Sequence, residues 1–219
     1  MGVDEARGSA VLEREIPLSR SPLLCKMGEQ CSKEPDKAMI ITPEREITYR
    51  EAYDLALSLI SVLHFEFRLD ASSRILMYLP NVVEVPSIIA AAQSLGCSLA
   101  FRAPSLIEYS LQNDVALLRP NLVIVLDADS AAAAESTSVP ILSLRGSMGR
   151  SVSLEVARAR VPAVDPGSVV PHSQLDPEIL LFSSGTTGTP KAIANRMSSF
   201  TSNAFELTAA LEISSRDVL

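Results

Sequence analysis

EILLFSSGTTGTPK, residues 178–191, joins an apolar strand pattern to a loop rich in glycine and hydroxyl groups. Glycine accepts positive φ angles and lets the backbone approach a ligand closely. Successive backbone N–H groups in such a turn form a concavity that binds anions. The hydroxyls add donors without bulk, and Lys191 adds a positive charge that can reach a phosphate. We therefore expect a phosphate-binding loop at the carboxyl end of a sheet strand, where α/β proteins usually bind ligands.

The loop fits neither of two common nucleotide-binding patterns. Pro190 stands where a Walker A loop needs its second glycine, and the chain has no GxGxxG segment. A connector without a ligand is the alternative, but the complete string directly after a strand favours binding. The residues expected to bind phosphates are Ser183, Ser184, Gly185, Thr186, Thr187, Gly188, Thr189 and Lys191.

Apolar strand patterns alternate with helical patterns upstream of this loop. The expected strands are two short ones within 38–49, then 74–80, 97–101, 121–127, 139–144 and 178–184. The expected helices are 19–33, a helix opened by the capping pair Thr48 and Glu51, 82–96, 105–118 and a short one at 131–134. This alternation predicts an α/β fold with a mostly parallel sheet flanked by helices.

Two further regions do not show this alternation of strand and helix patterns. Residues 1–18 are polar and are expected to form an N-terminal tail, leaving 19–219 as the folded part. Residues 145–176 contain several glycines and prolines, and we expect them to be a long surface connection.

Composition excludes several classes of protein. A net charge of −7 argues against a broad nucleic-acid-binding surface, which needs a basic face. The longest uncharged stretch, 85–101, is broken by Gly96, and we expect buried helix and strand there rather than a transmembrane segment. Three cysteines with no metal-binding spacing predict reduced thiols, and the acidic, charged N-terminus is not a secretory signal. These features together predict a cytoplasmic protein.

The segment LLFSSGTTGTPK resembles the signature of the AMP-binding, or adenylate-forming, superfamily. That group contains acyl- and aryl-CoA ligases, luciferase-like enzymes and adenylation domains of peptide synthetases. Four upstream segments are also similar to the family: ITYREAYDLALSLISVL (47–63), SSRILMYLPNVVEV (72–85), AAQSLGCSLAFRAPSL (91–106) and YSLQNDVALLRPNLVIV (109–125). The resemblance extends from about Pro35 to about Leu211. Departures at Phe101, Ala103, Ala192 and Arg196-Met197 leave the subfamily open.

The resemblance implies a reaction and its substrates. Family members join a small-molecule carboxylic acid to AMP, release pyrophosphate from ATP, and mostly pass the acyl group to CoA or a carrier thiol. The loop would hold the outer phosphates, and Lys191 would be the catalytic contact to pyrophosphate. Mg²⁺ is implied as well, with ligands that are not in this chain.

The same resemblance implies that residues 19–219 are a partial AMP-binding domain, the N-terminal portion of the large domain. The adenine, ribose and magnesium contacts and the C-terminal lid domain would lie beyond Leu219, so we expect residues 1–219 alone to be inactive. One hypothesis is an incomplete acid–thiol ligase, with a fragment of a peptide-synthetase adenylation domain as its variant. The other is a non-catalytic remnant with a binding role. The acid, the thiol acceptor and the oligomeric state stay open.

Overall fold

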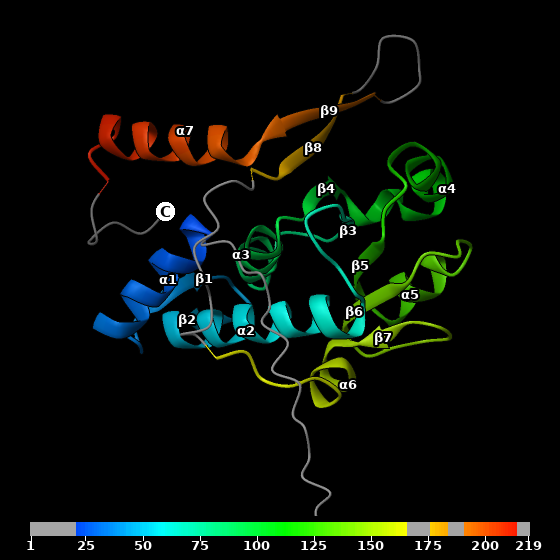
Figure 1. Cartoon of the computed structure of the whole chain (residues 1–219), viewed down its shortest axis with the longest axis horizontal. Helices are drawn as coiled ribbons and strands as arrows, with labels where there is room; N and C mark the ends of the chain where they lie inside the picture. The colour runs from blue at the N-terminus through cyan, green and yellow to red at the C-terminus, as the bar shows by residue number, and fades with distance from the viewer. Residues whose placement is uncertain (1–20, 166–175, 184–190, 214–219) are drawn as a thin grey trace, which may run out of the picture.

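The computed structural model describes residues 21–165, 176–183 and 191–213. Within them lies a seven-stranded sheet of order β7-β6-β5-β3-β4-β8-β9, in which every neighbouring pair is parallel except β8 and β9 (Figure 1). The sheet strands are β3 Arg74–Tyr78, β4 Ser98–Arg102, β5 Leu122–Asp127, β6 Ile141–Arg145, β7 Val152–Ser153, β8 Glu178–Ser183 and β9 Lys191–Arg196. A separate antiparallel hairpin is formed by β1 Ala38–Ile41 and β2 Glu46–Thr48. The predicted α/β class with a mostly parallel sheet is confirmed.

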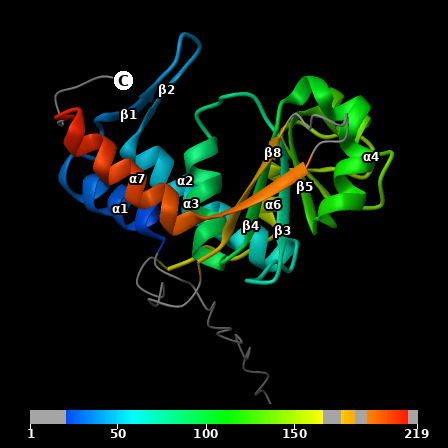
Figure 2. The same ribbon diagram turned by 90° about the horizontal axis from the view of Figure 1, so that it is seen from above.

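Helices cover both faces of the sheet. The α-helices are α1 Pro22–Lys33, α2 Tyr49–Ser61, α3 Val85–Leu95, α4 Ile107–Leu118, α5 Ala128–Ala134, α6 Leu154–Ala159 and α7 Met197–Ala210. A π-helical turn, Val62–Glu66, extends α2, and a 3₁₀ turn, Pro104–Leu106, precedes α4. Helices α1, α2, α3 and α6 contribute to one apolar core, and α4 and α5 to a second core on the other face (Figure 2).

The central strands are buried on both faces, because their side chains alternate between the two cores. In β3, Ile75 and Met77 belong to the first core, whereas Leu76 and Tyr78 belong to the second. This explains why the strand is apolar throughout and does not show polar alternation.

Local sequence signals set the ends of two helices. The Thr48 hydroxyl accepts a hydrogen bond from the Glu51 backbone N–H, and the Glu51 carboxylate accepts one from the Thr48 backbone N–H. These two bonds complete the predicted capping box at the start of α2. Gly96 ends α3 with a φ of 75°, in the left-handed region that favours glycine. The uncharged stretch therefore forms α3 and β4, as expected. Within the described ranges, no helix is both long and apolar enough to cross a membrane.

The expectation of a long surface connection over 145–176 is wrong in its first half. That region contains β7, which pairs with β6, and α6, whose Leu154 and Ala157 are buried in the first core. Ser153 accepts a hydrogen bond from the Val156 backbone and so starts α6. The glycines and prolines lie on either side of β7 and α6. Because they are so numerous, the sequence pattern did not indicate these two short elements. Residues 166–175 and the expected tail, residues 1–18, lie outside the described residues.

Candidate functional site

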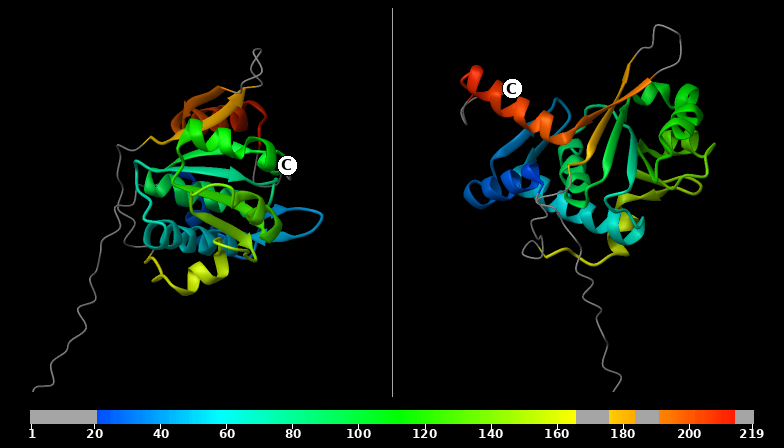
Figure 3. Two further views of the ribbon diagram at one scale, coloured as in Figure 1. Left: turned by 90° about the vertical axis from the view of Figure 1, so that its right-hand side faces the viewer. Right: turned by 45° about the horizontal axis from the view of Figure 1, so that its top comes forward.

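The predicted loop is flanked by two strands that form an arm at one edge of the sheet. We call β8 and β9 together the β8–β9 arm. The two strands pair along their whole length, from Glu178 opposite Arg196 to Ser183 opposite Lys191. In contrast, β8 pairs with β4 only at Ile179 and Leu180. The outer half of the arm therefore extends past the last paired residue of β4 (Figure 3).

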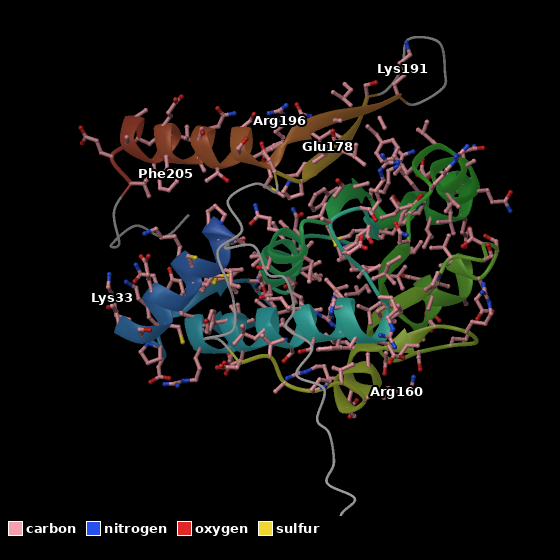
Figure 4. All side chains as sticks on the ribbon, viewed as in Figure 1. Lys33, Arg160, Glu178, Lys191, Arg196 and Phe205 are labelled. Atoms are coloured by element: carbon pink, nitrogen blue, oxygen red, sulfur yellow. The ribbon has the colours of Figure 1, made fainter. Side chains whose placement is uncertain are left out.

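Ser183 and Lys191 lie opposite each other at the outer end of the arm. The Ser183 hydroxyl lies 3.4 Å from the Lys191 carbonyl oxygen, and the Lys191 side chain is exposed. Figure 4 shows Lys191 at this outer end and Glu178 and Arg196 at the base. Strand β8 runs parallel to β4, and the loop follows its carboxyl end, as expected.

The remaining residues predicted to bind phosphates, Ser184 to Thr189, lie outside the described residues. The structure therefore brings together the first and last members of the predicted set. Their role in binding stays a prediction. The strand that begins at Lys191 and the helix α7 that follows it were not anticipated from the sequence.

A buried polar network lies beside the arm, at the carboxyl ends of β3 and β4. Oδ2 of Asp114 accepts hydrogen bonds from Nε of Arg102 at 2.7 Å, the Tyr78 hydroxyl at 2.5 Å and the Ser110 hydroxyl at 2.9 Å. Oδ1 accepts a second bond from the Arg102 guanidinium at 2.8 Å. The side chains of Asp114 and Arg102 are only 3% and 10% exposed. A buried ion pair of this kind needs such a set of hydrogen bonds.

The network reaches the arm through Arg102. Its guanidinium carbon lies 3.8 Å from the centroid of the Phe182 ring, in β8. The hydrogen bond that Arg102 donates to Asp114 raises the pKa of Arg102, so the guanidinium stays charged. Burial, together with Asp114, raises the pKa of Tyr78, so its hydroxyl stays a donor. The arm thus meets the core through a cation–π contact.

Sequence reasoning missed this network, although one signal was present. The buried positions of α4 are Ile107, Leu111, Asp114 and Leu118, a helical spacing with one carboxylate in an apolar stripe. A charged residue at such a position needs a buried partner, but spacing alone does not say which.

A second polar cluster lies at the opposite end of the sheet's carboxyl edge. Glu84, buried at the start of α3, is 3.2 Å from the Arg45 guanidinium and 3.6 Å from that of Arg145. These residues line a cavity of about 660 Å³ between the β1–β2 turn, α2, β6 and α6. Its acidic and basic side chains are mixed, so it lacks the positive surface that a triphosphate needs.

No metal centre is assigned. Within the described residues, no group of three or more His, Cys, Asp or Glu side chains could hold a metal ion. The cysteines Cys25, Cys31 and Cys97 are all free.

The family follows from comparison with known proteins. A mostly parallel sheet with a hydroxyl- and glycine-rich loop after one of its strands is typical of α/β proteins that bind a nucleotide. Residues 27–219 match the model of the AMP-binding enzyme family. The chain therefore belongs to the AMP-binding enzymes, as the resemblance predicts. A comparison with curated proteins gave no significant match.

Solved structures share the fold. A luciferase-like enzyme from the mealworm Zophobas morio is 21% identical with a TM-score of 0.66, over 85% of this chain and 44% of its own. An o-succinylbenzoate CoA synthetase from Bacillus subtilis, in complex with an acyl-adenylate intermediate, is 15% identical with a TM-score of 0.69, over 90% and 47%.

A putative long-chain-fatty-acid CoA ligase from Rhodopseudomonas palustris is also similar, with 15% identity and a TM-score of 0.71 over 88% of this chain and 48% of its own. At these identities the likeness establishes the fold. The chain spans about half the length of the structures it matches.

Proposed function

We propose that this chain supplies the triphosphate-binding part of an enzyme that activates a carboxylic acid with ATP. The observation that supports this function is the hydroxyl- and glycine-rich string from Ser183 to Lys191, placed after a strand that runs parallel to its neighbour. Backbone N–H groups and hydroxyls of the loop would donate hydrogen bonds to the β- and γ-phosphates. Lys191 would place its positive charge on the same phosphates.

In the proposed reaction, a carboxylate oxygen attacks the α-phosphorus of ATP, and the bond to the pyrophosphate oxygen breaks. The products are an acyl-adenylate and pyrophosphate. A carboxylate is a poor electrophile, whereas the acyl-adenylate has AMP as a good leaving group. Lys191 would stabilise negative charge on the departing pyrophosphate. Mg²⁺ would neutralise further charge there, with ligands from outside this chain.

The acyl group would then pass to a thiol, either CoA or a carrier protein. The adenine, ribose, magnesium and lid contacts would come from sequence outside these residues. We therefore propose that residues 1–219 bind the triphosphate but do not turn over by themselves. An adenylation domain of a peptide synthetase and a non-catalytic relative are the competing functions.

The test has a binding part and a catalytic part. MgATP, inorganic tripolyphosphate and AMP are titrated into residues 1–219 by calorimetry. We expect the two triphosphates to compete with each other and AMP to bind more weakly. No binding of either triphosphate would contradict the proposed site.

The catalytic part is exchange of labelled pyrophosphate into ATP across short-chain, long-chain and aromatic acids and amino acids. It is run on residues 1–219 and on the protein extended by any in-frame downstream sequence. Exchange that depends on an acid supports the enzyme, and an amino-acid preference would point to the peptide-synthetase variant. Triphosphate binding by the extended protein without exchange on any acid would favour the non-catalytic relative.

A further inference from the structure

The outer half of the β8–β9 arm is not paired with β4 through its backbone. Pairing of β8 with β4 stops at Leu180, yet β8 continues to Ser183. Beyond Leu180 the arm's inner face carries Phe182, which packs against the second core, with Ala192 opposite it on β9. On the outer face, Leu181 and Ile193 are 41% and 51% exposed. Phe182 is therefore the large side chain through which this part of the arm meets the core.

Phe182 contacts a rigid partner. The Arg102 guanidinium over its ring is held by two hydrogen bonds to Asp114, and Asp114 is held in turn by Tyr78 and Ser110. These residues come from β3, β4 and α4, so three elements of the core fix the guanidinium plane. A planar guanidinium stacked on a ring gives an attraction that a simple ammonium does not reproduce.

Phe182 lies next to both ends of the candidate phosphate loop. It precedes Ser183 in β8, and its register partner, Ala192, follows Lys191 in β9. A ring held in place at this position therefore restrains the backbone on both sides of the loop. We propose that Arg102 is a positioning residue for the candidate triphosphate site, acting through Phe182 to hold Ser183 and Lys191 against the sheet. The ligand part of this inference rests on the proposed function, whereas the restraint of the arm does not.

The first experiment measures hydrogen exchange by mass spectrometry in peptides that cover β8 and β9. Phe182→Leu removes the ring without leaving a buried charge unpaired. The matched control is Phe205→Leu, the same change at an exposed site on α7 (Figure 4). We expect Phe182→Leu to raise exchange in the arm by about 2- to 30-fold, from the range of cation–π contacts. In Phe182→Leu, exchange in β3 and β5 should stay at the wild-type rate. In the control, Phe205→Leu, exchange throughout the arm should stay at the wild-type rate.

A second variant tests whether Arg102 and Phe182 act together. Arg102→Lys keeps the charge but loses the planar group, and Arg50→Lys is its exposed control. If the two residues form one restraint, the double variant raises exchange in the arm no further than Phe182→Leu alone. Strictly additive effects would overturn the coupling. A rise of equal size in all peptides would show that Phe182 stabilises the whole fold and would overturn the positioning role.

The third measurement is the affinity for MgATP. Phe182→Leu should weaken it by a factor similar to the rise in exchange, and Phe182→Tyr, which keeps the ring, should restore it. Wild-type affinity despite a loosened arm would overturn the link between Arg102 and the site. If the wild-type protein binds no MgATP, the proposed function fails, and the exchange data alone still decide whether Arg102 restrains the arm.

Discussion

The hydroxyl of Tyr78 donates a 2.5 Å hydrogen bond to Oδ2 of Asp114, a residue 36 positions further along the chain. This bond ties the end of β3 to the middle of α4 in the second core. The same carboxylate holds Arg102 from β4, so one buried group connects three elements. Removal of any member leaves the others with unmet charge or hydrogen bonds.

Asp114→Asn should lower the free energy of unfolding by about 3 to 5 kcal/mol, because it leaves the buried Arg102 charge without its partner. Tyr78→Phe should cost less, about 1.5 to 3 kcal/mol, because it removes one hydrogen bond to a charged group. Urea denaturation followed by circular dichroism measures both. Asp36→Asn is the control, since the Asp36 side chain is 86% exposed. A cost for Asp114→Asn no larger than that of this control would contradict the network's role.

The buried thiol of Cys97 should make stability depend on pH. Burial, with a smaller contribution from Asp70, raises the pKa of Cys97 to about 12 from an ordinary value of 9.0. The unfolded chain therefore loses this proton first, and the stabilisation present below pH 9 is lost as pH rises towards 12. We expect the free energy of unfolding to fall by about 1 kcal/mol between pH 8 and pH 10.

Denaturation curves recorded between pH 7 and pH 10 check this prediction, with about 0.5-unit steps sufficient to resolve the slope. Cys97→Ala should flatten the part of the decline that begins near pH 9. Cys31→Ala, which changes a partly exposed free thiol, should leave it in place. An identical decline in the Cys97 variant would assign the effect to other groups. The raised pKa of Tyr78 acts in the same direction at higher pH.

Lys191→Ala should weaken binding of MgATP and of tripolyphosphate by about 1.5 to 3 kcal/mol, the usual scale of a charge-assisted contact. AMP should be affected much less, because the lysine is assigned to the outer phosphates. Calorimetric titration of each ligand measures the difference. Lys33→Ala removes an exposed lysine on α1 and is the matched control. Equal losses for ATP and AMP would show that the lysine has another role.

Gly96→Ala should cost about 1 to 2 kcal/mol of stability, because residue 96 has a φ of 75° at the end of α3. Gly96→Asn should recover part of this loss, since asparagine tolerates the left-handed region better than alanine. Thermal and urea unfolding of both variants give the comparison. If alanine proves as stable as glycine, α3 does not need this left-handed end.

Local sequence determined much of the architecture. Apolar runs such as 75–78 and 122–126 predicted buried parallel strands, and the Thr48–Glu51 pair predicted the start of α2. These predictions succeed because hydrophobic pattern and capping act between residues close in sequence. The string around Gly185 likewise predicted the family, because the chemistry of the loop lies within one short segment.

Tertiary structure alone decided the order of the strands and the support of the candidate site. The pairing of β4 with β8 joins residues about 80 positions apart, and no local pattern specifies it. The same holds for Arg102, which contacts Asp114 in α4 and Phe182 in β8. A buried charge among the apolar positions of a helix indicates only that it has a partner of opposite charge. Which residue fills that place depends on how distant elements pack, because the ion pair forms only when the core excludes water from both groups.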